Sequence, residues 1–172
     1  MIRILGSILI LGTTLWWGLY FAMKEKYRLR ELEELERSML CLQGQISYLS
    51  APLAEAMESI GWRTEGSLGL IFQKIAEALA ERKGESAEEI WKEIWRSEVV
   101  HTFLTEEDLE EVYLFGRSLG YLDKTQQANS ISLFLRYIGG ALEQGKKRLE
   151  KNGRLYYGMG VLSGLLIVVS LY

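Results

Sequence analysis

Residues 4–23 have the sequence ILGSILILGTTLWWGLYFAM, which contains no charged side chain. A helix of this length rises about 30 Å, which matches the hydrocarbon core of a bilayer. Aromatic residues gather at its C-terminal end, as in the aromatic belt of a membrane span: Trp16, Trp17, Tyr20 and Phe21. This stretch therefore predicts a transmembrane helix.

A second uncharged stretch, LYYGMGVLSGLLIVVSLY, occupies residues 155–172, and we expect it to span the membrane as well. The alternative for each stretch is a long amphipathic core helix, which the lack of a polar face disfavours. A cleavable signal peptide is a further alternative for the first stretch. Three features disfavour a signal peptide: only one charge, Arg3, precedes the stretch, the apolar run is long, and no clear cleavage site follows it.

Basic residues lie on the inner side of both stretches. Because Lys and Arg accumulate in cytoplasmic loops, we expect a two-pass protein of the cell membrane with both termini outside. The predicted parts are a first transmembrane helix (1–23), a cytoplasmic helical bundle (24–154) and a second transmembrane helix (155–172). The basic residues that support this topology are Lys24, Lys26, Arg28 and Arg30, and then Lys146, Lys147, Arg148, Lys151 and Arg154.

The region between the two stretches has the apolar spacing of α-helices, and no segment alternates as a half-buried strand does. Apolar residues recur every three or four positions after the first stretch and predict a heptad-like seam on a helix continuous with the span. They are Leu32, Leu35, Met39, Leu42, Ile46 and Leu49. A similar pattern predicts a long final helix that runs into the second span: Ala128, Ile131, Leu135, Ile138, Leu142 and Leu149.

Helix-capping and helix-breaking residues predict four short helices between the two long ones. Ser50 and Pro52 suit the start of the first short helix, which we expect to end at Gly61. The second is expected to begin near Ser67 and to stop at Gly84.

Capping residues also mark the next two short helices. Ser86 and Glu89 form the S-x-x-E capping box of the third, and Thr105 can cap the fourth, which we expect to end at Gly120. The predicted fold is all-α: a membrane hairpin that encloses a bundle of about six helices. The two long helices are continuous with the spans and are expected to pair antiparallel.

Charge is unevenly distributed along the chain. The net charge is −3, which provides no general field to attract nucleic acid, but residues 40–145 hold 17 acidic against 9 basic side chains. An acidic bundle stays soluble and away from an anionic membrane surface, or it serves as a docking surface for a partner. The same two interpretations apply to the acidic run Glu106, Glu107, Asp108, Glu110 and Glu111.

Residues for catalysis are scarce. His101 is the single histidine and Cys41 the single cysteine, so no Cys/His metal site or internal disulfide can form. We expect His101 to favour a helix C-terminus and Cys41 to be a small buried side chain. No phosphate-binding loop pattern occurs. We therefore predict a non-enzymatic protein without cofactor, metal or small-molecule substrate.

Small residues predict close helix packing. Gly116 and Gly120 are four positions apart on the expected fourth short helix, which is the fifth helix of the chain. In the spans, Gly160 and Gly164, like Gly18 and Ala22, form small-x-x-x-small pairs that let helices approach in lipid, either within this chain or against another membrane subunit.

Four stretches are distinctive: residues 4–22, YLSAPLAEA (48–56), FGRSLGYLDKTQQ (115–127) and GVLSGLLIVV (160–169). Together they resemble the stage III sporulation protein AB family of endospore-forming bacteria, along the whole chain. The resemblance implies a component of the channel complex between mother cell and forespore. It also implies that the cytoplasmic domain is similar to the platform proteins of type II secretion and type IV pilus systems.

The same resemblance implies partners and a location. The partners are the other stage III sporulation membrane subunits and their cytoplasmic ATPase, and the location is the outer forespore membrane with the bundle on the mother-cell side. The alternative function is a membrane-anchored regulatory or docking protein outside a channel complex.

Overall fold

In the part of the chain that the computed structural model describes, all regular secondary structure is helical, and no strand occurs there. The described backbone covers residues 2–49, 51–81, 84–120 and 124–171, and side chains are described at residues 20, 23–47, 51–81, 84–120 and 125–151.

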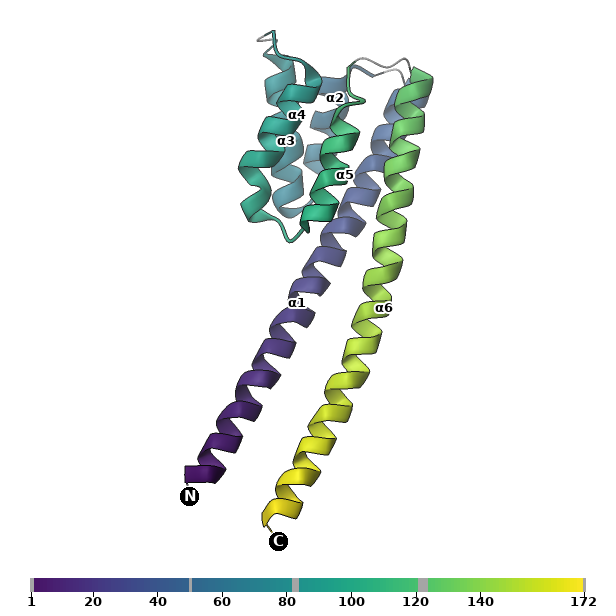
Figure 1. Cartoon of the computed structure of the whole chain (residues 1–172). Helices are drawn as coiled ribbons and strands as arrows, with labels where there is room; N and C mark the ends of the chain where they lie inside the picture. The colour runs from purple at the N-terminus through teal and green to yellow at the C-terminus, as the bar shows by residue number, and fades with distance from the viewer. Residues whose placement is uncertain (1, 50, 82–83, 121–123, 172) are drawn as a thin grey trace. The chain divides into compact units, whose positions relative to one another are not determined.

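The described helices follow the predicted order of one long helix, four short ones and one long one (Figure 1). A π-helical turn, Gln45–Leu49, continues the first long helix, and a 3₁₀ turn, Val99–His101, follows the third short one. The α-helices are α1 (Ile2–Gly44), α2 (Leu53–Arg63), α3 (Gly66–Ala80), α4 (Ala87–Glu98), α5 (Glu106–Gly116) and α6 (Lys124–Leu171).

The chain divides into two compact units. One unit, Arg28–Leu142, contains the end of α1, the four short helices and the start of α6, and we call it the bundle. The other unit consists of Met1–Tyr27 and Glu143–Tyr172, which are the outer parts of α1 and α6. The predicted domain, residues 24–154, includes this unit and extends beyond it at both ends, and its boundaries stay a prediction.

Membrane spans are not found among the described residues, where no helix is both long and apolar enough to cross a bilayer. The predicted spans, residues 4–23 and 155–172, fall almost wholly outside the residues whose side chains are described. The packing predictions for Gly18, Gly160 and Gly164 likewise lie outside those residues.

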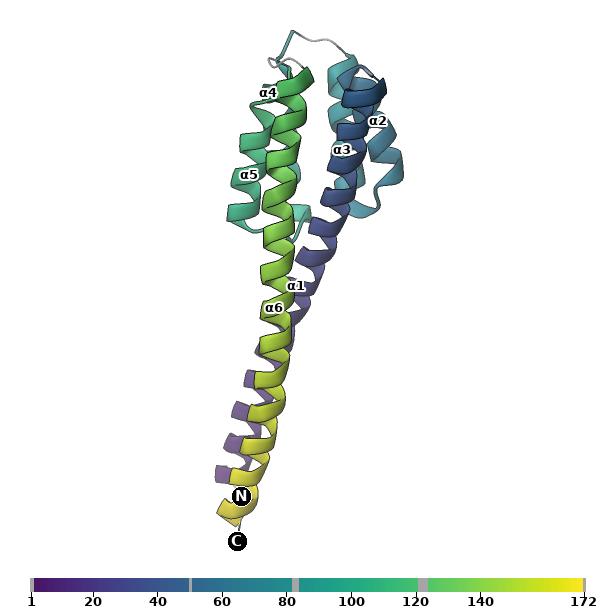
Figure 2. The same cartoon turned by 90° about the vertical axis from the view of Figure 1, so that its right-hand side faces the viewer.

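The predicted apolar seam of α1 lies in the core of the bundle from Leu32 to Ile46, and that of α6 lies there in part, since Ala128, Leu135 and Leu149 are half-buried. On α1, Leu32 and Met39 are fully buried, as are their seam neighbours Leu35, Leu42 and Ile46. On α6, the seam is buried at Ile131, Ile138 and Leu142, and Phe134 is buried beside it. Inside the bundle these parts of α1 and α6 run antiparallel (Figures 1 and 2), and the Gln43 side-chain amide donates to the Ser132 hydroxyl at 2.8 Å.

The predicted caps of α4 and α5 are confirmed. The Ser86 hydroxyl accepts from the Glu89 N–H, and the Glu89 carboxylate accepts from the Ser86 N–H at 2.9 Å. Thr105 and Asp108 form the same box at α5. At α2, Pro52 is the N-cap rather than a first-turn residue, and Ser50 lies outside the described residues.

Gly61 does not end α2, and that prediction was wrong because the glycine serves helix packing. It is buried within the helix, and a Cβ there would lie 2.6 Å from Cγ of Gln73 on α3. A Cβ on Gly69 of α3 would lie 2.1 Å from the Thr64 carbonyl oxygen. The two glycines therefore allow the backbones of α2 and α3 to approach closely.

A chain of aromatic rings crosses the bundle core from α3 to α6. Phe72 contacts Trp91 with ring centroids 6.3 Å apart, Trp91 contacts Phe115 at 5.3 Å, and Phe115 stacks on Phe134 at 5.3 Å. The Trp91 indole N–H donates to the Val112 carbonyl at 2.8 Å, which fixes the ring.

Gly116 and Gly120 have different roles. A Cβ on Gly116 would lie 2.3 Å from Cδ1 of Trp91, so α4 and α5 approach closely there. Gly120 is not on α5, which ends at Gly116; it has a φ of +92° and takes a left-handed conformation that suits glycine. The expectation that both glycines share one helix was therefore wrong.

Candidate functional site

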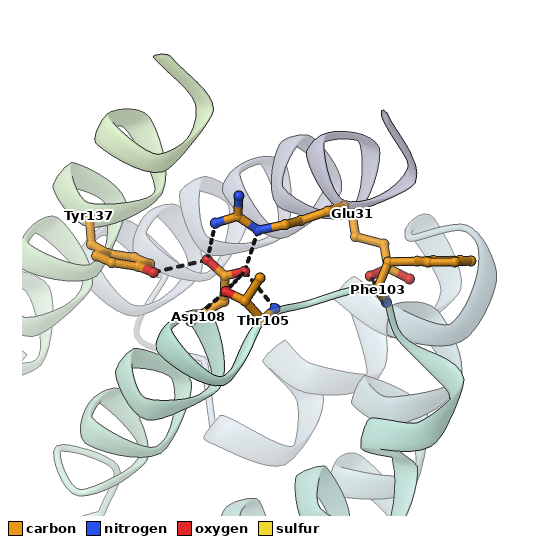
Figure 3. Close-up of polar contacts among 6 residues, drawn as sticks. Glu31, Phe103, Thr105, Asp108 and Tyr137 are labelled. Carbon is orange, nitrogen blue, oxygen red and sulfur yellow. Dashed lines mark hydrogen bonds and ion pairs between the residues drawn. The ribbon is translucent and has the colours of Figure 1, made fainter. Parts of the chain in front are cut away.

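Asp108, on the first turn of α5, accepts five hydrogen bonds from three other residues (Figure 3). Arg28 on α1 donates from Nε to Oδ2 at 2.6 Å and from Nη2 to Oδ1 at 2.8 Å. Tyr137 on α6 donates its hydroxyl to Oδ1 at 2.9 Å. Thr105 donates both its N–H, at 2.8 Å, and its hydroxyl, at 2.7 Å, to Oδ2. We call these four residues the Asp108 cluster.

The ion pair in this cluster is buried. Asp108 is 1% and Arg28 is 6% exposed. Burial acts to raise the pKa of Asp108, but the hydrogen bonds from Arg28, Thr105 and Tyr137 outweigh it and hold that pKa below its ordinary value. Burial, followed by the bond to Asp108, raises the pKa of Tyr137, so its hydroxyl keeps the proton that it donates.

The local sequence places each member of the cluster. Thr105 and Asp108 are positioned by the α5 capping box, because the N3 side chain reaches back to the N-cap N–H. Arg28 lies one turn before the buried Leu32 of the α1 seam, and Tyr137 lies one turn after the buried Phe134 of α6, so each shares a face with a core residue.

A second polar contact lies beside the cluster. The Glu31 carboxylate, one turn after Arg28 on α1, accepts from the Phe103 N–H at 2.6 Å (Figure 3). Burial raises the pKa of Glu31 to about 7, against the opposing effect of the Phe103 hydrogen bond. The nearby Asp108 charge adds to the rise. This contact holds the segment between the 3₁₀ turn and α5 against α1.

The Asp108 cluster connects helices to one another. A carboxylate has about four lone-pair positions, and five donors occupy those of Asp108, so no acceptor capacity remains for a substrate proton. In the described part of the chain, no three Asp, Glu, His or Cys side chains gather closely enough to hold a metal ion. The cluster joins α1, α5 and α6 through one buried carboxylate.

Sequence reasoning missed the Asp108 cluster and misplaced two of its members. Asp108 was predicted to belong to an exposed acidic surface, and Arg28 was counted among the basic residues next to the membrane. Both are buried because they pair with each other across 80 positions of sequence. No local pattern indicates a pair at that separation.

The other residues of the predicted acidic surface are accessible. Glu106, Glu107 and Glu110 are exposed, and Glu111 is half-buried. We call these four residues the α5 acidic face. Without Asp108, it is a smaller surface than the sequence predicted.

The single histidine and the single cysteine lie outside the cluster. His101 is exposed in the 3₁₀ turn after α4, and its carbonyl accepts from the Ser67 hydroxyl at 2.8 Å. Cys41 is half-buried beside the α1 seam, 3.7 Å from the side-chain nitrogen of Gln45.

Comparison with known proteins places this bundle in a family. The family model for stage III sporulation protein AB matches residues 3–172. The stage III sporulation protein AB of Bacillus subtilis (strain 168) is 25% identical over 171 residues, which cover 99% of each chain. A solved structure of a stage III sporulation protein AB shares the fold with a TM-score of 0.68 and 21% identity, over 72% of this chain and 97% of that one. The chain therefore belongs to the stage III sporulation protein AB family.

Proposed function

We propose that the protein is a non-enzymatic platform in the membrane complex that connects mother cell and forespore. Its family membership implies a role in sporulation. In this proposal the outer parts of α1 and α6 span the outer forespore membrane, and the bundle faces the mother-cell cytoplasm. The bundle links a cytoplasmic ATPase to the other stage III membrane subunits.

One observation carries the proposal: an acidic helical bundle is enclosed by two uncharged stretches, each with basic residues on the bundle side. The basic residues still support the orientation without Arg28, because Lys24, Lys26 and Arg30 are exposed. The Asp108 cluster supports a platform role as well. It couples the two helices that continue toward the uncharged stretches to α5, so a force on one of them is shared with the other.

Co-purification from sporulating cells tests the platform role. The full chain should bring down other stage III membrane subunits and an ATPase in a fixed ratio. A membrane-anchored regulator would bring down neither in fixed proportion, and that result would contradict the proposal.

The orientation predicts which cysteines react with a membrane-impermeant thiol reagent. In a Cys41→Ser background, Ser7→Cys and Ser170→Cys should be labelled in intact cells, because both termini are expected outside. Ser97→Cys on α4 should be labelled only after permeabilisation, because the bundle is expected inside. Ser97 suits this test because it is exposed, whereas Ser86 caps α4. Labelling of Ser97→Cys in intact cells would reverse the orientation.

The α5 acidic face is the proposed docking surface for the ATPase. Glu107→Lys together with Glu110→Lys should weaken ATPase recruitment about tenfold, since charge reversal replaces attraction by repulsion. Both side chains are exposed, so the fold should lose little stability. The measurement is the amount of ATPase co-purified at several salt concentrations.

The matched control is Glu85→Lys with Glu93→Lys, which makes the same change of charge at exposed positions next to and on α4. The control should recruit the ATPase normally. If the α5 variant is folded, inserted and as effective as the control, the α5 acidic face is not the docking surface.

A further inference from the structure

A groove of about 250 Å³ runs between α2 and α3. Its α2 wall comes from Glu55, Glu58 and Trp62, which follow helical spacing along one face. The groove is completed by Ala54 of α2 and by Gln73, Ala76, Glu77 and Ala80 of α3. Gly61 and Gly69 allow α2 and α3 to approach closely next to the groove.

The floor of the groove is small and apolar, and its rim is acidic and aromatic. Ala76 is buried, Ala54 is half-buried and Ala80 is exposed; all three carry only methyl groups, so a helix can approach closely over them. Trp62 stands at the rim with 74% of its surface exposed, which is unusual for so large an apolar side chain.

The three rim carboxylates, Glu55, Glu58 and Glu77, have no ion-pair partner among the described residues, and they are not arranged to hold a metal ion. A ligand with several cationic groups at helical spacing would satisfy all three, whereas a single ion would not. An exposed indole beside carboxylates also favours a cationic side chain, by its π-face and by the neighbouring charges.

We propose that this groove binds a basic amphipathic helix of a partner protein, with an arginine or lysine side chain placed over Trp62 and between the carboxylates. The helix supplies small residues against the alanine floor and basic residues, three or four positions apart, against the rim. The groove is separate from the α5 acidic face, because α2 and α5 lie on opposite sides of the bundle (Figure 2). The inference goes beyond the proposed function, since the occupant is defined by its chemistry and not by membership of the channel complex.

Site-specific photocrosslinking of the full chain in sporulating cells tests the proposal. A benzophenone side chain at Ala80 lines the groove, and one at Leu70, which is 58% exposed on the same helix, does not. The Ala80 variant should form a crosslink to a peptide with Lys or Arg at helical spacing. The Leu70 variant should not form that product.

Second substitutions in the Ala80 variant establish how the product depends on the rim. Trp62→Ala, or Glu58→Lys with Glu77→Lys, should lower its yield about tenfold, because the first removes the aromatic face and the second replaces attraction to a basic helix by repulsion. Glu85→Lys with Glu93→Lys should leave the yield unchanged. Replacing the partner's basic residues with Glu should restore the crosslink between the partner and the chain that carries Glu58→Lys and Glu77→Lys.

The results that would overturn the proposal are distinct from failure of the platform role. They are a crosslink to a lipid, to a second copy of this chain or to a segment without basic residues, equal yields from Ala80 and Leu70, or no crosslink. Co-purification of the ATPase and the other subunits is scored separately and does not depend on any of them.

Discussion

Replacing Asp108 with Asn lowers the free energy of unfolding by about 3–5 kcal/mol, because Arg28 is then left charged and unpaired in the core. Asn keeps the shape of the side chain, so the loss reports the missing charge and the donors left facing the amide nitrogen, rather than a cavity. The measurement is denaturant unfolding of the full chain in detergent, followed by the fluorescence of the buried Trp91 and Trp95.

The matched control for Asp108→Asn is Glu107→Gln. It makes the same change of charge at the preceding position, where the side chain is exposed, and should change the stability by less than about 0.5 kcal/mol. Adding Arg28→Met to Asp108→Asn should recover part of the loss, because it removes the stranded charge. Equal stabilities for Asp108→Asn and Glu107→Gln would show that the buried pair contributes nothing.

The same carboxylate predicts a dependence on pH. The pKa of Asp108 is below its ordinary value in the folded protein, so its contribution is present above the pKa of the unfolded chain, about 4. That contribution is lost as the pH falls through the lowered pKa. The loss of stability of the wild-type chain in acid should therefore be steeper than that of Asp108→Asn.

Replacing Gly116 with Ala has the second largest expected effect, a loss of about 1–3 kcal/mol from overpacking. The new Cβ would lie 2.3 Å from Cδ1 of Trp91. Trp91 cannot yield easily, because it is fully buried, bonded to the Val112 carbonyl and packed on Phe115. The same unfolding experiment measures the loss.

Gly140→Ala is the matched control, since a Cβ at Gly140 of α6 meets no described atom within 4 Å. There the substitution should stabilise the helix by about 0.5–1 kcal/mol, because Ala loses less backbone freedom than Gly on folding. The two Gly→Ala changes should therefore have opposite signs. A stabilising Gly116→Ala would mean that α4 and α5 are not in close contact at Trp91.

Local sequence was sufficient for the order of the helices and for the N-caps of α4 and α5, but not for the ends of α2 and α5. Ser86 with Glu89 and the Thr105 N-cap were predicted because a capping bond joins residues three positions apart, within one turn of backbone. The α1 seam from Leu32 to Ile46 was predicted because burying one face of a helix requires apolar residues at every third or fourth position. Both signals are complete within a few turns of helix.

Tertiary structure decided what lies between the helices. A glycine at position 61 suggests the end of a helix. Its actual role depends on Gly69 and Gln73 of another helix, against which it packs. Asp108 has the sequence context of an exposed helix start, and Arg28 that of a residue beside the membrane. The sequence by itself determined the order of the helices, the N-caps of α4 and α5 and the apolar face of α1, because those depend on neighbours along the chain. The burial of Asp108 and Arg28 depends on a partner 80 positions away, which only the packing of α1, α5 and α6 supplies.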